Sequence, residues 1–443
     1  MNGEEICQRV IEMCRKEGAT DVVASIGESE ETMVRFSNNE ITVIDDLDQK
    51  VCSIFVKVEA RKAGTTVEDL SQPSLRTAAR KVVAAARNSP PADAYVPLPK
   101  GPFRYDPELR MSPPVTTDLD VLVSWTRGAI DAGLKEGAER MAGSLIASNG
   151  TYTMATSGDV AASSAGGSLE ISLRAFGKDH ASGHSVSISP SDGMFSPERA
   201  GAEAGEYARL SASPVKGEPG SFRTILGPLA FAGLMNQFGR VSSAFLVDSG
   251  MSFLGGKVGQ KLAPEWFYLY DDASMPNTYG SSAFDAEGLP TRRTEIIEDG
   301  VLKSYLHNSV TAQKYGTGST ANAGLVAPRP FNLEVSPGTK ELDELIAEVD
   351  SGIMVTNAWY LRYQNYSTGD FSVIPRDAMF LIKKGEVAGS LKELRISENM
   401  LRLVGGIQEA SRERKWIKWW EVRTPTLSPS VLVGDVRFTR SEI

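Results

Sequence analysis

Histidine and cysteine are scarce in this chain, with three of each among 443 residues. A catalytic zinc site usually takes three ligands from His, Cys, Asp and Glu, so the sequence holds little material for one. Three cysteines cannot form a disulfide framework, and none follows Cys52. We therefore expect a reduced protein in which Cys7, Cys14 and Cys52 are small buried hydrophobic residues.

Long apolar runs and an excess of basic charge are also absent. No stretch approaches the ~18 consecutive apolar residues of a membrane-spanning helix. Asp and Glu number 56 against 47 Lys and Arg, which gives a net charge of −9. Binding to nucleic acid draws on clustered basic residues, so direct nucleic-acid contact is not expected. The 41% hydrophobic and 23% charged content is typical of a globular chain, and we predict a cytoplasmic protein without membrane contact.

Residues 1–88 predict an N-terminal α/β module. Apolar residues at helical spacing from Ile6 to Cys14 predict a first helix that ends near Gly18. A second helix is predicted over 71–87, with Ser71 as its N-cap. Between the helices, turn residues predict a β-meander. Its expected strands are 21–27, 32–37, 40–46 and 49–59, with turns at Asn38-Asn39 and at 45–48.

A linker and a middle region follow. Eight prolines fall within 89–117, a density that neither a helix nor a central strand tolerates. Residues 118–220 then predict a helix over 118–136 and an antiparallel sheet of hairpins. The hairpin turns are expected at Asn149-Gly150, Ser157-Gly158 and Gly166-Gly167.

Residues 221–443 predict a larger β-rich C-terminal domain with flanking helices. The expected elements are a strand at 222–226, a helix at 229–238, a strand pair at 293–297 and 301–307, a helix at 341–349, and strands from 353 to 438. The predicted class is α+β, an N-terminal α/β module with a β-meander plus a C-terminal domain of antiparallel sheets.

Candidate catalytic residues are few. His180, His184 and His307 are the only histidines, and a structural role is the favoured interpretation for each. His180 and His184 lie in a strand-like segment, where four residues span about 13 Å, too far for one metal ion. The sequence has no G-x-S-x-G nucleophile motif and no phosphate-binding G-x-x-x-x-G-K-[ST] loop.

One stretch combines aromatic side chains, amides and an arginine. This composition is typical of a surface that binds a peptide or a protein partner. Packing of the aromatic rings into the core explains the stretch equally well. The candidate contact residues are Asn357, Trp359, Tyr360, Arg362, Gln364, Asn365, Gly369, Asp370 and Phe371.

Several segments, in order along the chain, carry a family resemblance. They are Val-Arg-Phe-Ser-Asn-Asn-Glu-Ile at 34–41, Glu-Asp-Gly-Val-Leu-Lys-Ser-Tyr-Leu at 298–306 followed by Thr311-Ala312, Thr-Gly-Asp-Phe-Ser at 368–372 with Ile-Lys-Lys-Gly-Glu at 382–386, and Arg-Thr-Pro-Thr-Leu at 423–427 with Val433-Gly434. Together they resemble the TldD/PmbA (TldE) family of intracellular zinc metallopeptidases and their partner subunits.

The resemblance also locates where a zinc site would be. TldD-type chains carry a His-Glu-x-x-x-His helix and a distant Cys ligand, and the Glu activates water. Gly227-Pro228 and Ala232-Gly233 match the lead-in, which places the corresponding helix within 222–250. That window has no His, Cys or Glu. The resemblance therefore implies a PmbA/TldE-type chain, whose degenerate zinc-helix positions are Asn236, Gln237, Arg240 and Val241.

The resemblance implies a non-catalytic subunit that assembles with a TldD-type subunit and captures peptide. We expect no cofactor on this chain and zinc in the partner. One alternative is an autonomous homodimeric metallohydrolase that uses His180, His184 and His307. The other is a non-enzymatic, protein-binding regulator, in line with the family's other name, modulator of DNA gyrase.

Overall fold

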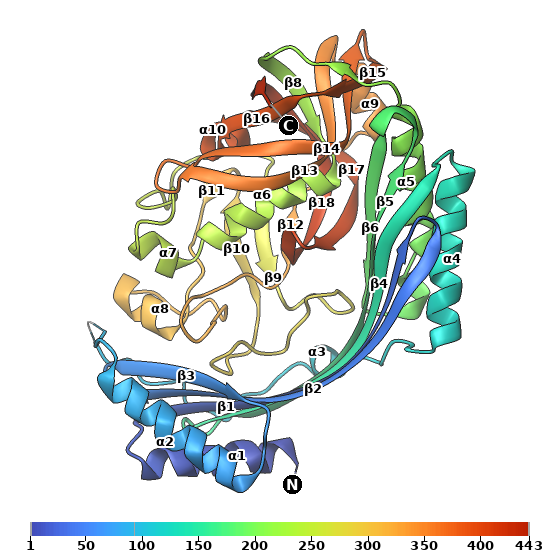
Figure 1. Ribbon diagram of the computed structural model, residues 1–443. Helices are drawn as coiled ribbons and strands as arrows, with labels where there is room; N and C mark the ends of the chain where they lie inside the picture. The colour runs from blue at the N-terminus through green and yellow to red at the C-terminus, as the bar shows by residue number, and fades with distance from the viewer. Residues whose placement is uncertain (1, 93, 442–443) are drawn as a thin grey trace.

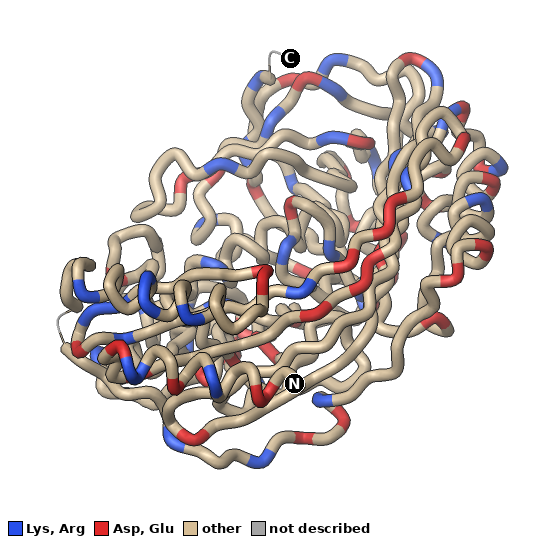
Figure 2. The backbone as a smooth tube through the Cα atoms, turned by 60° about the horizontal axis from the view of Figure 1, so that its bottom comes forward, with Lys and Arg blue, Asp and Glu red and all other residues tan. Residues whose placement is uncertain are grey.

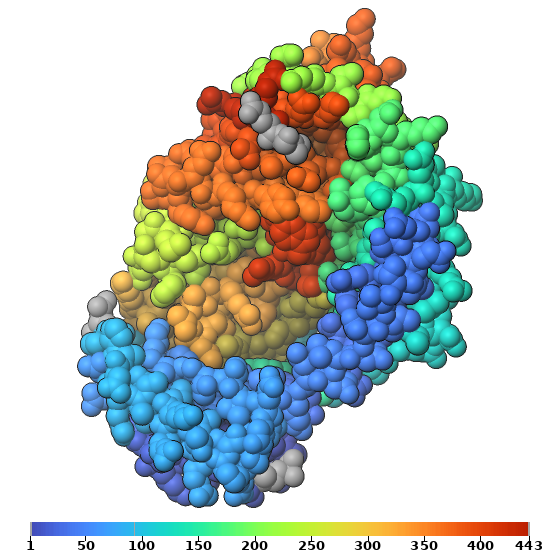
Figure 3. All heavy atoms as spheres, in the orientation of Figure 1, coloured from blue at the N-terminus to red at the C-terminus, as the bar shows by residue number. Residues whose placement is uncertain are grey.

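The chain folds into two sheets with helices around them, as a computed structural model describes for residues 2–92 and 94–441. The long strands of the first sheet curve along one side of the molecule, and the second sheet lies inside that curve (Figure 1). In the space-filling view, the N-terminal atoms form the lower part of the visible face, below the C-terminal segments (Figure 3). The predicted α+β class is confirmed.

The first sheet is antiparallel throughout and takes strands from both 1–88 and 118–220. The strand order is β3 (Arg61–Val67), β2 (Glu40–Val58), β1 (Asp21–Ser37), β4 (Arg140–Thr156), β5 (Ala161–Phe176) and β6 (Ser182–Ser189). The regions before and after the Pro-rich segment therefore belong to one sheet, joined by the backbone hydrogen bonds between β1 and β4.

The meander has fewer and longer strands than predicted. Asn38 and Asn39 form the expected two-residue turn, and both have positive φ. The predicted turn at 45–48 is wrong, because these residues continue β2 and pair with β1. Asp46 accepts a 2.7 Å hydrogen bond from the Thr32 hydroxyl. Continuous pairing thus outweighs the weak strand preference of the aspartates, whose side chains face solvent.

Two of the three predicted turns in the middle region are also wrong. Ser157-Gly158 does lie in the turn after β4, but Asn149-Gly150 and Gly166-Gly167 pair with each other inside β4 and β5. Gly167 permits close approach of another segment, since a Cβ there would lie 2.6 Å from the Val115 nitrogen. The Asn149 amide bonds both backbone groups of Val115, which fastens the Pro-rich segment to the sheet.

Helices cover the face of the first sheet that is turned away from the second sheet (Figure 1). One pair packs against β1 and β2 and encloses the three cysteines, and burial raises the pKa of Cys7 and Cys14 to about 12. The other pair packs against β4 and β5. The pairs are α1 (Gly3–Lys16) with α2 (Gln72–Asn88), and α4 (Leu119–Lys135) with α5 (Pro197–Leu210); α3 (Pro107–Arg110) and the 3₁₀ turns Lys178–His180 and Asp192–Met194 are shorter.

The second sheet is built from residues 215–440 and contains both parallel and antiparallel pairs. The predicted strand at 301–307 is regular only at Val301–Leu302. The order is β11 (Val301–Leu302), β10 (Arg293–Glu298), β9 (Leu269–Asp272), β12 (Leu333–Val335), β18 (Val422–Arg440), β8 (Gly220–Leu226), β13 (Ser351–Asn365), β14 (Asp370–Lys383), β15 (Glu386–Lys392) and β7 (Val215–Lys216), with β16 (Leu394–Asn399) on β14 and β18, and β17 (Ile407–Trp419) on β18.

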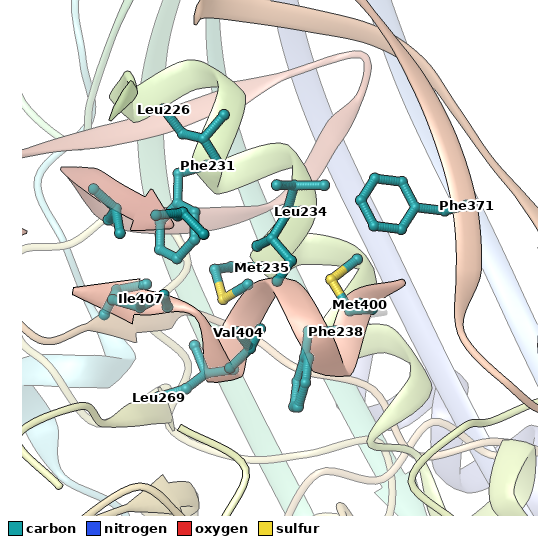
Figure 4. Packing of buried hydrophobic residues seen from close by; sticks show 14 of the residues in the cluster. Leu226, Phe231, Leu234, Met235, Phe238, Leu269, Phe371, Met400, Val404 and Ile407 are labelled. Atoms are coloured by element: carbon teal, nitrogen blue, oxygen red, sulfur yellow. The ribbon is translucent and has the colours of Figure 1, made fainter. Parts of the chain in front are cut away.

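Helix α6 (Pro228–Val241) lies in the largest hydrophobic cluster, which includes residues of β14 and of α10 (Met400–Gly405) (Figure 4). Phe231 and Phe238 of α6 are fully buried there. The remaining helices are α7 (Ala244–Asp248), α8 (Ser309–Tyr315) and α9 (Leu342–Ala347). None of the helices in the described ranges combines the length and the apolar character that crossing a bilayer requires.

The contact between α4 and α5 depends on glycine. A Cβ at Gly205 would lie 2.3 Å from the carbonyl oxygen of Gly133. We expect Gly205→Ala to lower the free energy of unfolding by about 1–3 kcal/mol, because the two helix backbones must separate. Gly233→Ala in α6 is the control, since its Cβ meets no atom within 4 Å, and we expect it to stabilise by about 0.5–1 kcal/mol. Urea unfolding of both variants measures the difference, and equal effects would contradict this account of the contact.

Candidate functional site

A cavity of about 910 Å³ lies beside α6, at the position where the sequence predicted a degenerate zinc helix. Its walls come from distant parts of the chain: α6 with the start of α7, Gly280, the segment 327–331, Arg362 of β13, and the turn between β17 and β18 with the first residues of β18. The residues that give it chemical character are Asn236, Gln237, Arg240, Phe245, Arg329, Phe331, Arg362, Trp420, Glu421 and Arg423.

The structure of α6 determines which of its side chains reach the cavity. Pro228 at the first turn follows Gly227, a favoured start for a helix. The apolar face of α6 packs into the core. Asn236, Gln237 and Arg240 line the cavity, whereas Val241 is fully buried in the hydrophobic cluster.

The predicted zinc-helix positions do not fit a zinc ion. The Asn236 amide is buried and donates hydrogen bonds to the Thr424 carbonyl at 2.7 Å and to the Thr426 hydroxyl at 3.3 Å. Gln237 is neutral and cannot act as a general base. Across residues 2–92 and 94–441, no three His, Cys, Asp or Glu side chains are grouped so that they could hold a metal.

The charge of the cavity lining is strongly positive. Four arginines, at positions 240, 329, 362 and 423, line it together with a single acid, Glu421. The Glu421 carboxylate accepts a 2.7 Å hydrogen bond from the Tyr360 backbone N–H. In the described part of the chain, none of the four guanidinium groups has a carboxylate within 4 Å. Such a lining repels divalent cations and attracts anions.

An aromatic cluster lies between the cavity and the first sheet. The rings of Trp359, Trp419 and Trp420 are 5.3–5.5 Å apart between centroids, in edge-to-face contacts. The Tyr360 ring lies tilted against Trp420, with 5.6 Å between the ring centroids, and these two residues are 41% and 51% exposed. Trp419 is thus part of the core, whereas its neighbour Trp420 lies at the surface.

The stretch predicted to bind a peptide or partner divides between core and surface. Asn357, Gly369 and Phe371 are buried. Asp370 is half-buried and accepts hydrogen bonds from Thr368 and Asn399. Tyr360, Arg362, Gln364 and Asn365 are exposed, and Arg362 among them lines the cavity.

His184 joins the two sheets. It lies on β6, where its Nε2 is 3.0 Å from the Ser172 hydroxyl, and its Nδ1 is 2.7 Å from the Asn357 amide of β13. Its ring contacts Trp419 at 4.7 Å. Both hydrogen-bond partners of the imidazole are neutral, and burial lowers its pKa to about 4.

The other two histidines lie in different surroundings. His180 is exposed at the end of a 3₁₀ turn, with a positive φ, so it is not on a strand beside His184 as expected. His307 is buried, with its Nδ1 3.2 Å from the Thr311 hydroxyl and its ring beside Tyr305 and Tyr315. Burial lowers its pKa. Within the described part of the chain, the three histidines share no hydrogen-bond partner.

Sequence reasoning missed two of the four cavity arginines and the ion pairs that join the second sheet to the first sheet and to α5. Arg329 lies between two prolines in a segment without regular secondary structure, and Arg423 was noticed only within the 423–427 motif. Arg174 of the first sheet pairs with buried Asp377 of the second, and Lys415 and Lys418 pair with Glu203 and Glu170. Nothing in the local sequence distinguishes these residues from ordinary surface charges.

Comparison with known proteins gives consistent matches. Residues 219–440, half of the chain, match a family model described as the PmbA/TldA metallopeptidase C-terminal domain. A metalloprotease PmbA homolog of Haemophilus influenzae is 25% identical over 430 residues, 90% of this chain and 91% of that one. A metalloprotease of Methanocaldococcus jannaschii is 30% identical over 204 residues, so the match spans only 44% of that relative.

Solved structures share the fold. TldE from Thermococcus kodakarensis has a TM-score of 0.85 at 22% identity, over 98% of this chain and 100% of that one. A Thermotoga maritima protein, described as a candidate modulator of DNA gyrase, has a TM-score of 0.84 at 24% identity, over 98% and 100%.

The environment of His184 predicts a pH-dependent stability. Its pKa is about 4 in the folded protein against 6.5 ordinarily, so the unfolded chain binds a proton that the folded chain does not. The stabilising contribution is complete above the ordinary pKa and is lost as the pH falls towards the folded value. We expect the difference in unfolding free energy between wild type and His184→Gln to shrink by about 3 kcal/mol between about pH 7 and about pH 4. Urea unfolding measures it, and parallel pH profiles would show that the imidazole is not held neutral.

Proposed function

We propose, given that the chain belongs to the TldD/PmbA metallopeptidase family, that it is a non-catalytic, TldE-like subunit of a cytoplasmic peptidase. In this proposal the chain assembles with a TldD-type subunit that carries the zinc ion. It contributes the scaffold and a cavity that holds the peptide, and the partner cleaves the bond.

The observation that carries this proposal is the composition of the α6 cavity. In a catalytic relative this helix would hold zinc. Here the Asn236 amide is already hydrogen-bonded to the Thr424 carbonyl, Gln237 is neutral, and Arg240 presents a positively charged guanidinium. Val241, the last of the predicted positions, is buried in the core. Three further arginines face the same space. A metal ion placed there would lack ligands and would be repelled by the surrounding charge.

The retained cavity supports a role in holding peptide. Its volume is in the range of about 300–1,000 Å³ that is usual for ligand sites. Arg362 lies on β13 and Arg423 on β18, so a bound peptide would lie beside the ends of two strands of the second sheet. The exposed rings of Tyr360 and Trp420 at the rim offer apolar area to a peptide or a partner.

The autonomous metallohydrolase is not favoured. His180 is exposed, His184 lies between Ser172 and Asn357, and His307 lies beside Thr311, so no two of them face a common space.

We expect peptidase activity only when this chain is mixed with a TldD-type chain. We expect the purified chain to hold substoichiometric zinc and to leave unfolded peptides intact. Added to a TldD-type chain from the same source, it should co-elute as a complex and produce peptidase activity that a chelator abolishes. Zinc is measured by mass spectrometry, and cleavage by the release of new peptide termini.

Two outcomes would contradict the proposal. Stoichiometric zinc in the isolated chain that is lost in His184→Ala or His307→Ala would establish an autonomous site. Failure to bind any TldD-type chain, together with recovery of a different protein target, would favour the regulator instead.

A further inference from the structure

The four cavity arginines form a charge cluster that the proposed function does not by itself explain. The chain carries a net charge of −9, and basic and acidic residues are interspersed along most of it (Figure 2). Arginines elsewhere, such as Arg402 and Arg414, have carboxylate partners. The cavity instead gathers Arg240, Arg329, Arg362 and Arg423 around one acid.

The contacts of these side chains leave their donors available. Arg362 makes one hydrogen bond, from Nη1 to its neighbouring Leu361 carbonyl, and its guanidinium lies 5.9 Å from the Tyr360 ring. Arg240, Arg329 and Arg423 make no side-chain hydrogen bond within residues 2–92 and 94–441. Each guanidinium offers five N–H donors in a planar arrangement that matches a carboxylate.

We propose that this cavity binds the carboxylate groups of a peptide substrate through Arg362 and Arg423, with Arg240 and Arg329 adding to the positive charge. The inference rests on the proposed function for the peptide and on the lining for the charge. Paired N–H···O bonds from a guanidinium to a carboxylate are directional, so they orient a peptide as well as attract it. The carboxylate can be the peptide's free C-terminus or an Asp or Glu side chain.

A peptide fits the site better than a nucleic acid does. The acidic chain as a whole repels a polyanion, whose binding requires many phosphate contacts over a wide surface. The lining also includes the apolar surfaces of Phe245, Phe331 and Trp420 next to the arginines. That mixture suits a segment with both charged and apolar side chains.

Binding of four labelled peptides to the full chain tests the proposal. All four have the same length and the same apolar sequence. They combine Glu or Gln at two positions with a free or an amidated C-terminus.

The Gln peptide with an amidated C-terminus is the neutral reference. We expect fluorescence anisotropy to show that the peptides with Glu, those with a free C-terminus, or both groups bind at least about tenfold more tightly than this reference. Which of the two gains affinity identifies the source of the carboxylate. Added salt should weaken binding of the peptides that gain affinity from a carboxylate, and should leave binding of the neutral amidated peptide unchanged.

Substitutions then locate the site. We expect the double variant Arg362→Gln with Arg423→Gln to lose that preference, while Arg76→Gln with Arg80→Gln on α2, an equal change of charge away from the cavity, retains it. The substituted side chains are exposed, so both proteins should fold, and circular dichroism checks this. Retention of the preference by the double variant, equal binding of all four peptides, or tighter binding of a single-stranded oligonucleotide would each overturn the proposal.

The peptide-binding test and the test of the subunit role can fail independently of each other. Assembly with a TldD-type chain and activity in the mixture can both hold while the four peptides bind equally, in which case only the carboxylate assignment fails. Conversely, the isolated chain can select carboxylates while no catalytic partner binds it, and then only the subunit role fails.

Discussion

The fixed position of α6 is the constraint on which the cavity depends. Phe231 and Phe238 anchor the helix in the largest core cluster, and the Asn236 amide binds it to β18. Only one narrow side of the helix, at Gln237 and Arg240, remains free to face the cavity. Because the helix cannot turn without breaking that packing, the residues on this side decide what the cavity can hold.

The second constraint is the contact between the two sheets. His184 and the tryptophan cluster, with the ion pair between half-buried Arg174 and buried Asp377, hold the first sheet against β13, β14 and β17. Trp420 extends from the same cluster to the rim of the cavity. The same tryptophan cluster therefore supports the packing between the sheets and the rim of the cavity. A substitution at His184 would alter both.

Local sequence patterns were sufficient for the fold class and for the helices α1, α2, α4, α6 and α9, but they did not predict the short helices α3, α7, α8 and α10. The predicted helix at 118–136 is α4 at Leu119–Lys135, and the predicted N-terminal helix with its end near Gly18 is α1. Predictions of turns from glycine and aspartate failed where sheet pairing determines the backbone, as at 45–48 and at Gly166-Gly167. The arginine cluster was not predictable, because its members lie on segments up to 183 residues apart and only tertiary structure brings them together.

The central claim is that the α6 cavity is built for an anion and not for a metal ion. Anomalous diffraction at the zinc absorption edge, from crystals of the isolated chain soaked with zinc, tests it most directly. The account predicts no anomalous peak among Gln237, Arg240 and Arg423, even where zinc binds elsewhere on the surface. A strong peak in that cavity, coordinated by Gln237 or Glu421, would contradict it.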